Sequence, residues 1–211
     1  MKNPRLILSI ESAIQSGSIS LLRGTEEIGA WVGEKAVSRS EELLTEISKI
    51  FSANSLSLAD IDLIAVSNRF GSHTGLRIGL ATALGLHRAS GAGIVGISLL
   101  EALADQFPSK EGVISAVSGN ARDYFAQQFA DSQIDEAAKY TEEGFRELVS
   151  AAKPGSVAVN DLIFESCRTI ESPETRLFNA GRNLAKCIGL FAAARDISPD
   201  TASLNIGSDE F

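Results

Sequence analysis

The stretch SNRFGSHTGLRIGLA, residues 67–81, contains three glycines and three hydroxyl side chains between two segments of different periodicity. The run DIDLIAVSN, at residues 60–68, is apolar enough for a strand that is covered on both faces. The run GLRIGLATALGLHRAS, at residues 75–90, has helical spacing. Because glycines between two such runs indicate a tight turn, the stretch predicts a strand, a turn and a helix of an α/β protein.

The residues before this unit predict three strands and then a first helix. The strands are expected at residues 5–12, 16–24 and 26–34, the first two joined by a turn around residues 15–17. The helix is expected at residues 39–55, with Ser38 or Ser40 as its N-cap. Its apolar side carries Leu43, Leu44, Ile47, Ile50 and Phe51. A strand at 92–98 and a helix at 99–107 are expected to complete this half.

After Pro108 the pattern of strands followed by alternating helices and strands begins again. Two adjacent strands are expected at residues 112–119 and 122–130, around a Gly119-Asn120 turn that is a strong hairpin signal. A helix at 141–153, a strand at 155–160 and a helix at 179–196 are expected to follow. We therefore predict a duplicated α/β architecture with two lobes, residues 1–108 and 109–211.

Composition limits the function classes. The chain has 211 residues, a formal net charge of -8 and a pI near 4.9, which disfavours nucleic-acid binding by this chain alone. Cys167 and Cys187 lack metal-ligand spacing and are expected to be reduced and partly buried, with a disulfide as the less favoured alternative. The N-terminal apolar run is interrupted by Ser9 and Glu11, so we expect neither a signal peptide nor a membrane span, and a cytoplasmic location.

The glycine turn has two interpretations. Its backbone amides, the hydroxyls of Ser72 and Thr74, Gly75 and the guanidinium of Arg77 could hold a phosphate at the start of the helix. Alternatively, Ser72 or Thr74 caps the helix, and the glycines allow a tight turn and close packing. The cap is favoured because no P-loop lysine follows the glycines.

The helix at 75–90 has little side-chain bulk on part of its surface, at Gly75, Gly79, Ala81, Ala83 and Gly85. Each helical glycine costs about 1 kcal/mol relative to alanine, so another interaction must offset the loss. Packing against the chain's own sheet and close approach by a helix of another protein both explain these residues, and both are expected on different faces.

The sequence also resembles a known family. GSHTGLRIGLATALGL, at residues 71–86, is similar to the signature G-S-F-T-G-L-R-I-G-x-A-x-A-x-G-L of the TsaB family, also called YeaZ, whose members help to make threonylcarbamoyladenosine in tRNA. LILSIES, RSEELLTEI, LSLADIDLIAVS and GIVGISLLEALA resemble further family segments in the same order. Together they cover roughly residues 5–104, and beyond residue 110 only the layout is similar.

The resemblance implies an actin-like ATPase fold of two lobes and a non-catalytic subunit. Such a subunit docks on a catalytic TsaD-type chain, a TsaE-type ATPase joins them, and tRNA binds only through the complex. The resemblance implies no catalytic residue and no metal site in this chain, and no cofactor bound by the chain alone, with ATP or ADP as an option at a shared interface. Its docking helices would also allow a homodimer. The alternative function is a stand-alone actin-like enzyme, a small-molecule kinase or a peptidase.

The family docks through the two helices of the first half. The expected docking residues are Ser40, Leu43, Leu44, Ile47, Leu76, Gly79, Ala83 and His87.

The sequence departs from the family pattern around the expected turns. Glu11 stands where the family has Asp, Arg69-Phe70 where it has Gly-Pro, His73 where it has Phe, and Arg39 where it has His. In actin-like ATPases the acid at the end of the first strand organises hydrated Mg²⁺. For Glu11 we favour hydrogen bonds to nearby backbone amides over metal binding.

Overall fold

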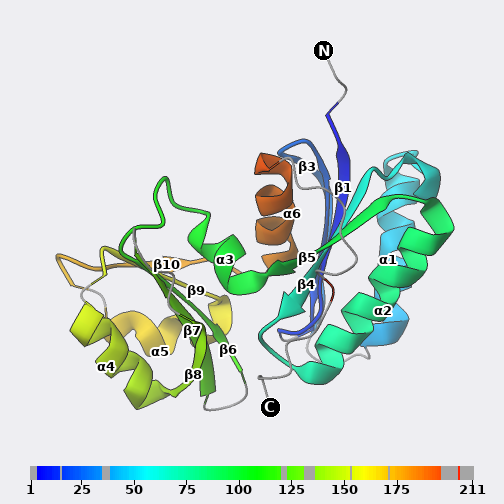
Figure 1. Ribbon diagram of the computed structural model, residues 1–211. Helices are drawn as coiled ribbons and strands as arrows, with labels where there is room; N and C mark the ends of the chain where they lie inside the picture. The colour runs from blue at the N-terminus through cyan, green and yellow to red at the C-terminus, as the bar shows by residue number, and fades with distance from the viewer. Residues whose placement is uncertain are drawn as a thin grey trace.

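The computed structural model describes residues 4–14, 16–34, 39–119, 123–130, 136–152, 154–170, 172–195 and 204. The side chains of residues 39–41, and with them the expected caps Ser38 and Ser40, lie outside this part. Figure 1 shows two sheets side by side, each carrying helices. Both are five-stranded, in the orders β3-β2-β1-β4-β5 and β10-β9-β6-β7-β8. No helix of the described part is long and apolar enough to cross a membrane.

The first sheet is built from the strands expected in the first half of the chain. Its strands are β1 (Leu6–Glu11), β2 (Ser18–Arg23), β3 (Glu26–Val32), β4 (Leu63–Arg69) and β5 (Gly93–Ser98). The strand β1 pairs antiparallel with β2 and parallel with β4. All six residues of β1 are buried, which requires a helix layer on each face of the sheet.

One face of this sheet is covered by the two long helices of the first lobe. They are α1 (Arg39–Ala53) and α2 (His73–Ser90), with the short η1 (Leu58–Asp60) between them in sequence. Leu8 and Ile10 of β1 share a buried cluster with Leu43 and Ile47 of α1 and Leu80 of α2. The helical periodicity therefore predicts the buried Leu43, Ile47, Ile50 and Phe51 correctly, but Leu44, expected on the same side, is 55% exposed.

The second sheet repeats the topology of the first. Its elements are β6 (Val113–Ser118), β7 (Asp123–Phe129), β8 (Ala138–Thr141), α4 (Glu142–Ala152), β9 (Ser156–Val159), α5 (Asp161–Cys167), η2 (Arg168–Ile170) and β10 (Arg176–Asn179). Within each lobe the strands have the order third, second, first, fourth, fifth, and the first strand runs antiparallel to the second and parallel to the fourth. The predicted duplication is confirmed. Asn120 of the expected hairpin turn lies outside the described residues.

The elements β8, β10 and α5 were not expected from the sequence. The two strands have four residues each and form the edges of the second sheet, so they hold their shape through pairing with β7 and β9. Short strands with mixed polar residues carry a weak periodic signal.

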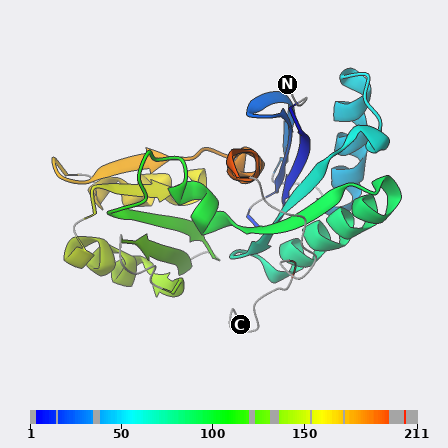
Figure 2. The same ribbon diagram turned by 45° about the horizontal axis from the view of Figure 1, so that its top comes forward.

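The last helix, α6 (Leu184–Ala194), crosses back to the first lobe, and Figure 2 shows it nearly end-on between the sheets. A Cβ on Gly189 would overlap Leu22 and lie 2.8 Å from Ser9 Oγ, so α6 approaches β1 and β2 closely. Ser18 Oγ of β2 accepts a hydrogen bond from the backbone N–H of Ala185 at 2.9 Å. The predicted boundary at residues 108 and 109 falls between the strands of the two sheets, and α6, which follows this boundary in the sequence, packs on the first sheet.

The lobes share a continuous apolar core. One buried cluster joins Ile7 and Phe70 of the first lobe to Val117 and Phe125 of the second, with Ile188 of α6 among them. The helix α3 (Leu99–Ala104), which links the sheets, contributes to the same cluster. Both cysteines are free and buried, as expected, and burial raises the pKa of Cys167 and of Cys187 to about 12. Neither thiol is therefore poised for reaction.

An ion pair fastens the C-terminal end of α6 to the end of α3. Arg195 Nη1 donates to Asp105 Oδ2 at 2.8 Å, Nη2 donates to Oδ1, and the guanidinium lies 3.7 Å from the centre of the Phe191 ring. The hydrogen bonds from Arg195 hold the pKa of Asp105 below its ordinary value of 3.8. Because the folded-state pKa is lowered, this pair stabilises the fold above the ordinary carboxyl pKa, and the contribution is lost as pH falls through the folded-state pKa.

Replacing Asp105 with Asn is expected to lower the free energy of unfolding by about 1 kcal/mol near neutral pH, the scale of a partly exposed ion pair. The difference from wild type should shrink as pH falls below 3.8 and through the folded-state pKa of Asp105, because protonation then removes from wild type the pair that the variant already lacks. Urea unfolding at the two pH values measures it.

Glu165→Gln provides the control, because Glu165 pairs with Arg168 at 3.3 Å with 73% of its side chain exposed. That variant should unfold as wild type does. An Asp105→Asn deficit that is equally large at both pH values would contradict the assignment.

Candidate functional site

The turn after β4 starts α2 with a side-chain cap. Ser72 is the N-cap, and its hydroxyl accepts a hydrogen bond from the backbone N–H of Gly75 at 3.3 Å. The backbone N–H of Ser72 donates to the carbonyl of Ala13 at 2.9 Å. The cap interpretation of Ser72 is confirmed. Thr74 and Arg77 are exposed and Gly75 is buried. The alternative, that these residues bind a phosphate, stays a prediction.

The β1–β2 turn lies directly against this turn. Gly71 has φ +115, and a Cβ there would lie 2.8 Å from both Ala13 Cβ and Ile14 Cδ1. Ser12 Oγ donates to the carbonyl of Gly75 at 2.8 Å. Glycine at position 71 is therefore required both by the left-handed backbone and by this close approach.

Glu11 is bound by the backbone of its own turn. Its carboxylate accepts hydrogen bonds from the backbone N–H groups of Ala13, at 2.6 Å, and Ile14, at 2.9 Å. The residue is only 1% exposed. The preferred interpretation of Glu11 is thus confirmed: the carboxylate supplies the negative charge toward which these amides point.

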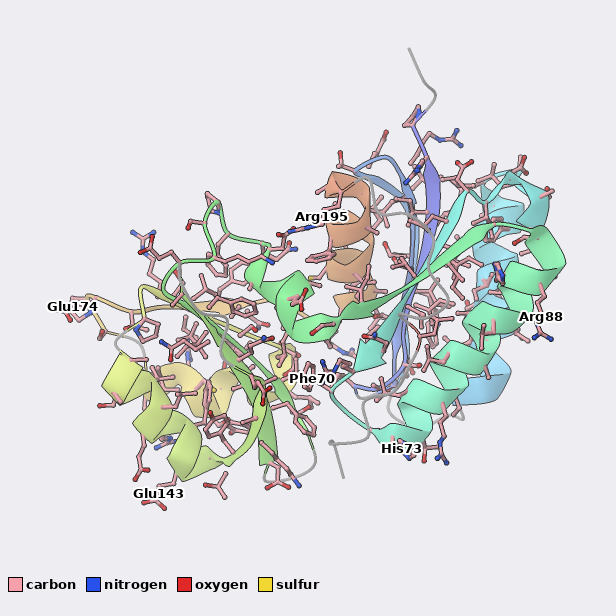
Figure 3. All side chains as sticks on the ribbon, in the orientation of Figure 1. Phe70, His73, Arg88, Glu143, Glu174 and Arg195 are labelled. Carbon is pink, nitrogen blue, oxygen red and sulfur yellow. The ribbon has the colours of Figure 1, made fainter. Side chains whose placement is uncertain are left out.

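Phe70 fills the space between the lobes at this level, as Figure 3 shows. It has φ +69, a left-handed backbone that costs an ordinary residue about 1 kcal/mol or more. Its side chain is 3% exposed, and its ring centroid lies 5.7 Å from that of Phe125 on β7. Burial of the aromatic ring against the second lobe offsets the backbone strain.

The expected docking residues mostly point into the first lobe. Leu43, Ile47, Leu76, Gly79 and Ala83 are all buried. A Cβ on Gly79 would overlap Ser12 Oγ and lie 3.6 Å from Val66 Cγ2, so this glycine lets α2 approach the end of β1. The chain's own packing therefore buries these five residues, and their role as partner contacts stays a prediction.

Three other predicted positions have different surroundings. His87 is half-buried, and its Nδ1 lies 2.6 Å from the carbonyl oxygen of Ala92, so the ring holds the end of α2. Leu44 of α1 stays 55% exposed. Ser40 lies in α1, but its side chain is outside the described part. Leu44 is thus available for a partner.

The outward face of α2 carries the small residues that are free to meet another molecule. Thr74, Arg77, Ala81, Gly85 and Arg88 are exposed at spacings of three or four residues, so they form one stripe along the helix. A Cβ on Gly85 would meet no atom within 4 Å. The sequence identified the small residues but not which of them face outward.

A shallow apolar groove lies beside the two helices. Its volume is about 260 Å³, and the residues that line it include Leu44, Ile47, Phe51, Leu56, Leu58 and Leu86. Leu58 is 36% exposed at its edge. Together with the outward stripe of α2, the groove makes the α1–α2 surface the candidate interaction site.

The duplicated lobes, each with the same mixed sheet, and the helix between them define the actin-like ATPase fold. YeaZ from Pseudomonas aeruginosa superimposes with a TM-score of 0.66, at 18% identity over 96% of this chain and 99% of that chain. The activator of 2-hydroxyisocaproyl-CoA dehydratase from Clostridium difficile, with bound ADPNP, gives a TM-score of 0.55, at 10% identity over 90% of this chain and 94% of that one.

Sequence comparison gives the family. The model of the family TsaD: tRNA N6-adenosine threonylcarbamoyltransferase matches residues 33–199. The tRNA threonylcarbamoyladenosine biosynthesis protein TsaB of Haemophilus influenzae is 25% identical over 149 residues, 68% of this chain and 61% of that protein. The chain belongs to this family, and its resemblance to TsaB and YeaZ is confirmed.

The nucleotide that the fold class implies does not fit the residues of the β1–β2 turn. An Mg²⁺-bound phosphate would require backbone amides open to the ligand and an acid turned toward the metal. Here the backbone amides of Ala13 and Ile14 donate hydrogen bonds to the Glu11 carboxylate. The Ser12 hydroxyl donates a hydrogen bond to the carbonyl of Gly75 in α2. We therefore assign no reaction step to a nucleotide at this turn.

Replacing Glu11 with Ala is expected to lower the free energy of unfolding by about 2 to 3 kcal/mol, because two buried amides lose a charged acceptor. Acetate should restore part of the melting temperature of this variant by entering the vacated position, and it should leave wild type unchanged. Thermal unfolding across an acetate series, matched in ionic strength with chloride, measures both effects.

Asp60→Ala serves as the matched control, since Asp60 accepts from the backbone N–H of Ser57 at 2.7 Å in an exposed turn. This variant should lose less stability than Glu11→Ala and gain nothing from acetate. The assignment would be refuted by a Glu11→Ala protein as stable as wild type, or by one that responds to acetate no more than Asp60→Ala does.

Proposed function

We propose that this chain is a non-catalytic subunit of the machinery that transfers a threonylcarbamoyl group to an adenosine of tRNA. In this proposal it docks on a TsaD-type catalytic chain, a TsaE-type ATPase joins the assembly, and tRNA binds through the complex. ATP or ADP belongs to an interface shared with a partner. In the same proposal the complex works in the cytoplasm.

The observation that carries the proposal is the outward face of α1 and α2. Leu44 is 55% exposed on α1, and Gly85 of α2 has open space where a side chain would project. A glycine in the interior of an exposed helix destabilises it, so a role outside this chain explains its presence better than internal packing does. Small residues on a helix surface allow the backbone of another helix to come close.

Family membership and charge support the same assignment. The curated relative TsaB is named for threonylcarbamoyladenosine biosynthesis, although the match spans 61% of its length. The net charge of -8 disfavours tRNA binding by this chain alone, so a partner must provide the basic surface.

Replacing Gly85 with Leu is expected to weaken binding to the TsaD-type chain of the same genome by about tenfold or more, because added volume separates two closely packed helices. The variant should keep or raise its melting temperature, since leucine favours a helix more than glycine does. Pull-down titration and thermal unfolding give the two readouts.

Two further variants separate docking from folding. Gly79→Leu should unfold at lower temperature because its side chain would collide with Ser12, whereas Ser150→Leu on the exposed surface of α4 should change neither readout. A folded Gly85→Leu protein that binds the TsaD-type chain as wild type does would remove α2 from the proposed surface.

The chain alone is expected to leave tRNA unmodified and ATP unhydrolysed, and to restore threonylcarbamoyl transfer when it is added to the TsaD- and TsaE-type chains. Mass spectrometry of the tRNA nucleosides measures the product. ATP turnover by the lone chain that Glu11→Gln abolishes would instead favour the stand-alone kinase.

A further inference from the structure

The charge of α2 is opposite to that of the whole chain. The protein has a formal net charge of -8, yet the eighteen residues of α2 include no Asp or Glu. Arg77 and Arg88 are exposed on this helix, and Figure 3 shows Arg88 projecting from its outer side. In the part of the chain that the structure describes, neither guanidinium has a hydrogen bond or an ion pair. The helix therefore presents two unpaired cations.

The two arginines bracket the small residues of the outward face. Eleven positions separate them, which is about three helical turns or about 16 Å, so they lie on nearly the same side. Ala81 and Gly85 lie between them on that side. Gly79 is small because Ser12 occupies the space next to it, but nothing within this chain occupies the space next to Gly85.

Among the side chains of α1 that the structure describes, no carboxylate pairs with this stripe. On α1, Glu46 is paired with Lys49 at 2.6 Å. Glu42 is half-buried, with one carboxylate oxygen shielded from solvent. The basic character of the α2 face therefore remains available to an incoming molecule.

We propose that this face accepts a partner helix with acidic residues near both ends of its contact, and that Arg77 and Arg88 disfavour pairing with a second copy of this chain. This inference rests on the proposed docking function and adds to it the charge pattern of the partner surface. The small residues set how closely the helix approaches, and the two arginines select which helix it is.

Symmetry explains the bias against self-association. If two copies pack their α2 helices antiparallel across Ala81 and Gly85, Arg77 of each copy lies opposite Arg88 of the other. If the helices pack parallel about a two-fold axis, each arginine lies opposite its own equivalent. Both arrangements bring like charges together, whereas an acidic partner converts the same positions into attractive contacts.

Opposite responses to salt are the first test. Raising ionic strength from about 0.05 M to about 0.5 M should strengthen self-association of wild type and weaken its binding to the TsaD-type chain by about tenfold, because salt screens repulsion and attraction alike. Sedimentation velocity measures the first and a titration in the same buffers the second. Self-association that weakens with salt, or partner binding that is insensitive to it, would overturn the inference.

Charge reversal on one copy tests the same face without any partner protein. The Arg77→Glu/Arg88→Glu variant mixed with wild type at low salt should form heterodimers several times more tightly than either protein forms homodimers. The control, Arg168→Glu/Arg176→Glu, makes the same change in net charge at exposed positions of the second lobe. Mixing that yields no excess of heterodimer over this control contradicts the charge pattern.

The two proposals can fail separately. A wild-type chain that does not bind the TsaD-type chain at any ionic strength contradicts the proposed function, whatever the mixing experiment shows. Binding that persists unchanged when Arg77 and Arg88 are both reversed leaves the proposed function intact and overturns the charge pattern.

Discussion

The strand β1 is buried over its full length, so two helices must approach it closely, one on each face. Two glycines permit this approach: Gly79 of α2 faces Ser12, and Gly189 of α6 faces Ser9 and Leu22. A side chain at either position would hold its helix away from the sheet and open a gap in a close-packed core. The arrangement of both helix layers in the first lobe depends on these two contacts.

This packing determines which parts of the chain remain available for function. The inner face of α2 is used by the sheet. The turns around Glu11 and Ser72 satisfy backbone groups of their own and of each other. Phe70 closes the space between the lobes by packing on Phe125. The polar ends of β1 and β4, where a ligand of an open α/β sheet would sit, are thus largely occupied by the protein itself.

The outward face of α2 differs in both packing and charge. Gly85 has no internal role in packing, and Arg77 and Arg88 have no charged partner among the described residues. The interior stabilises the fold without this surface. The composition of the outward face of α2 therefore points to an interaction outside the chain. The small residues determine how closely a partner helix can approach, and the two arginines determine which partner is favoured. Because these are separate physical effects, Gly85→Leu tests the first and Arg77→Glu/Arg88→Glu tests the second.

The sequence by itself determined the local features of this protein. Periodicity gave the alternating strands and helices and the duplication, and the Ser72 cap and the Glu11 hydrogen bonds followed from residues a few positions apart. Only the tertiary structure decided the direction of the small residues on α2, because Gly79 and Ala83 on one side resemble Ala81 and Gly85 on the other. It also decided the return of α6 to the first sheet and the short edge strands β8 and β10, since contacts between distant segments stabilise them and leave little trace in local periodicity.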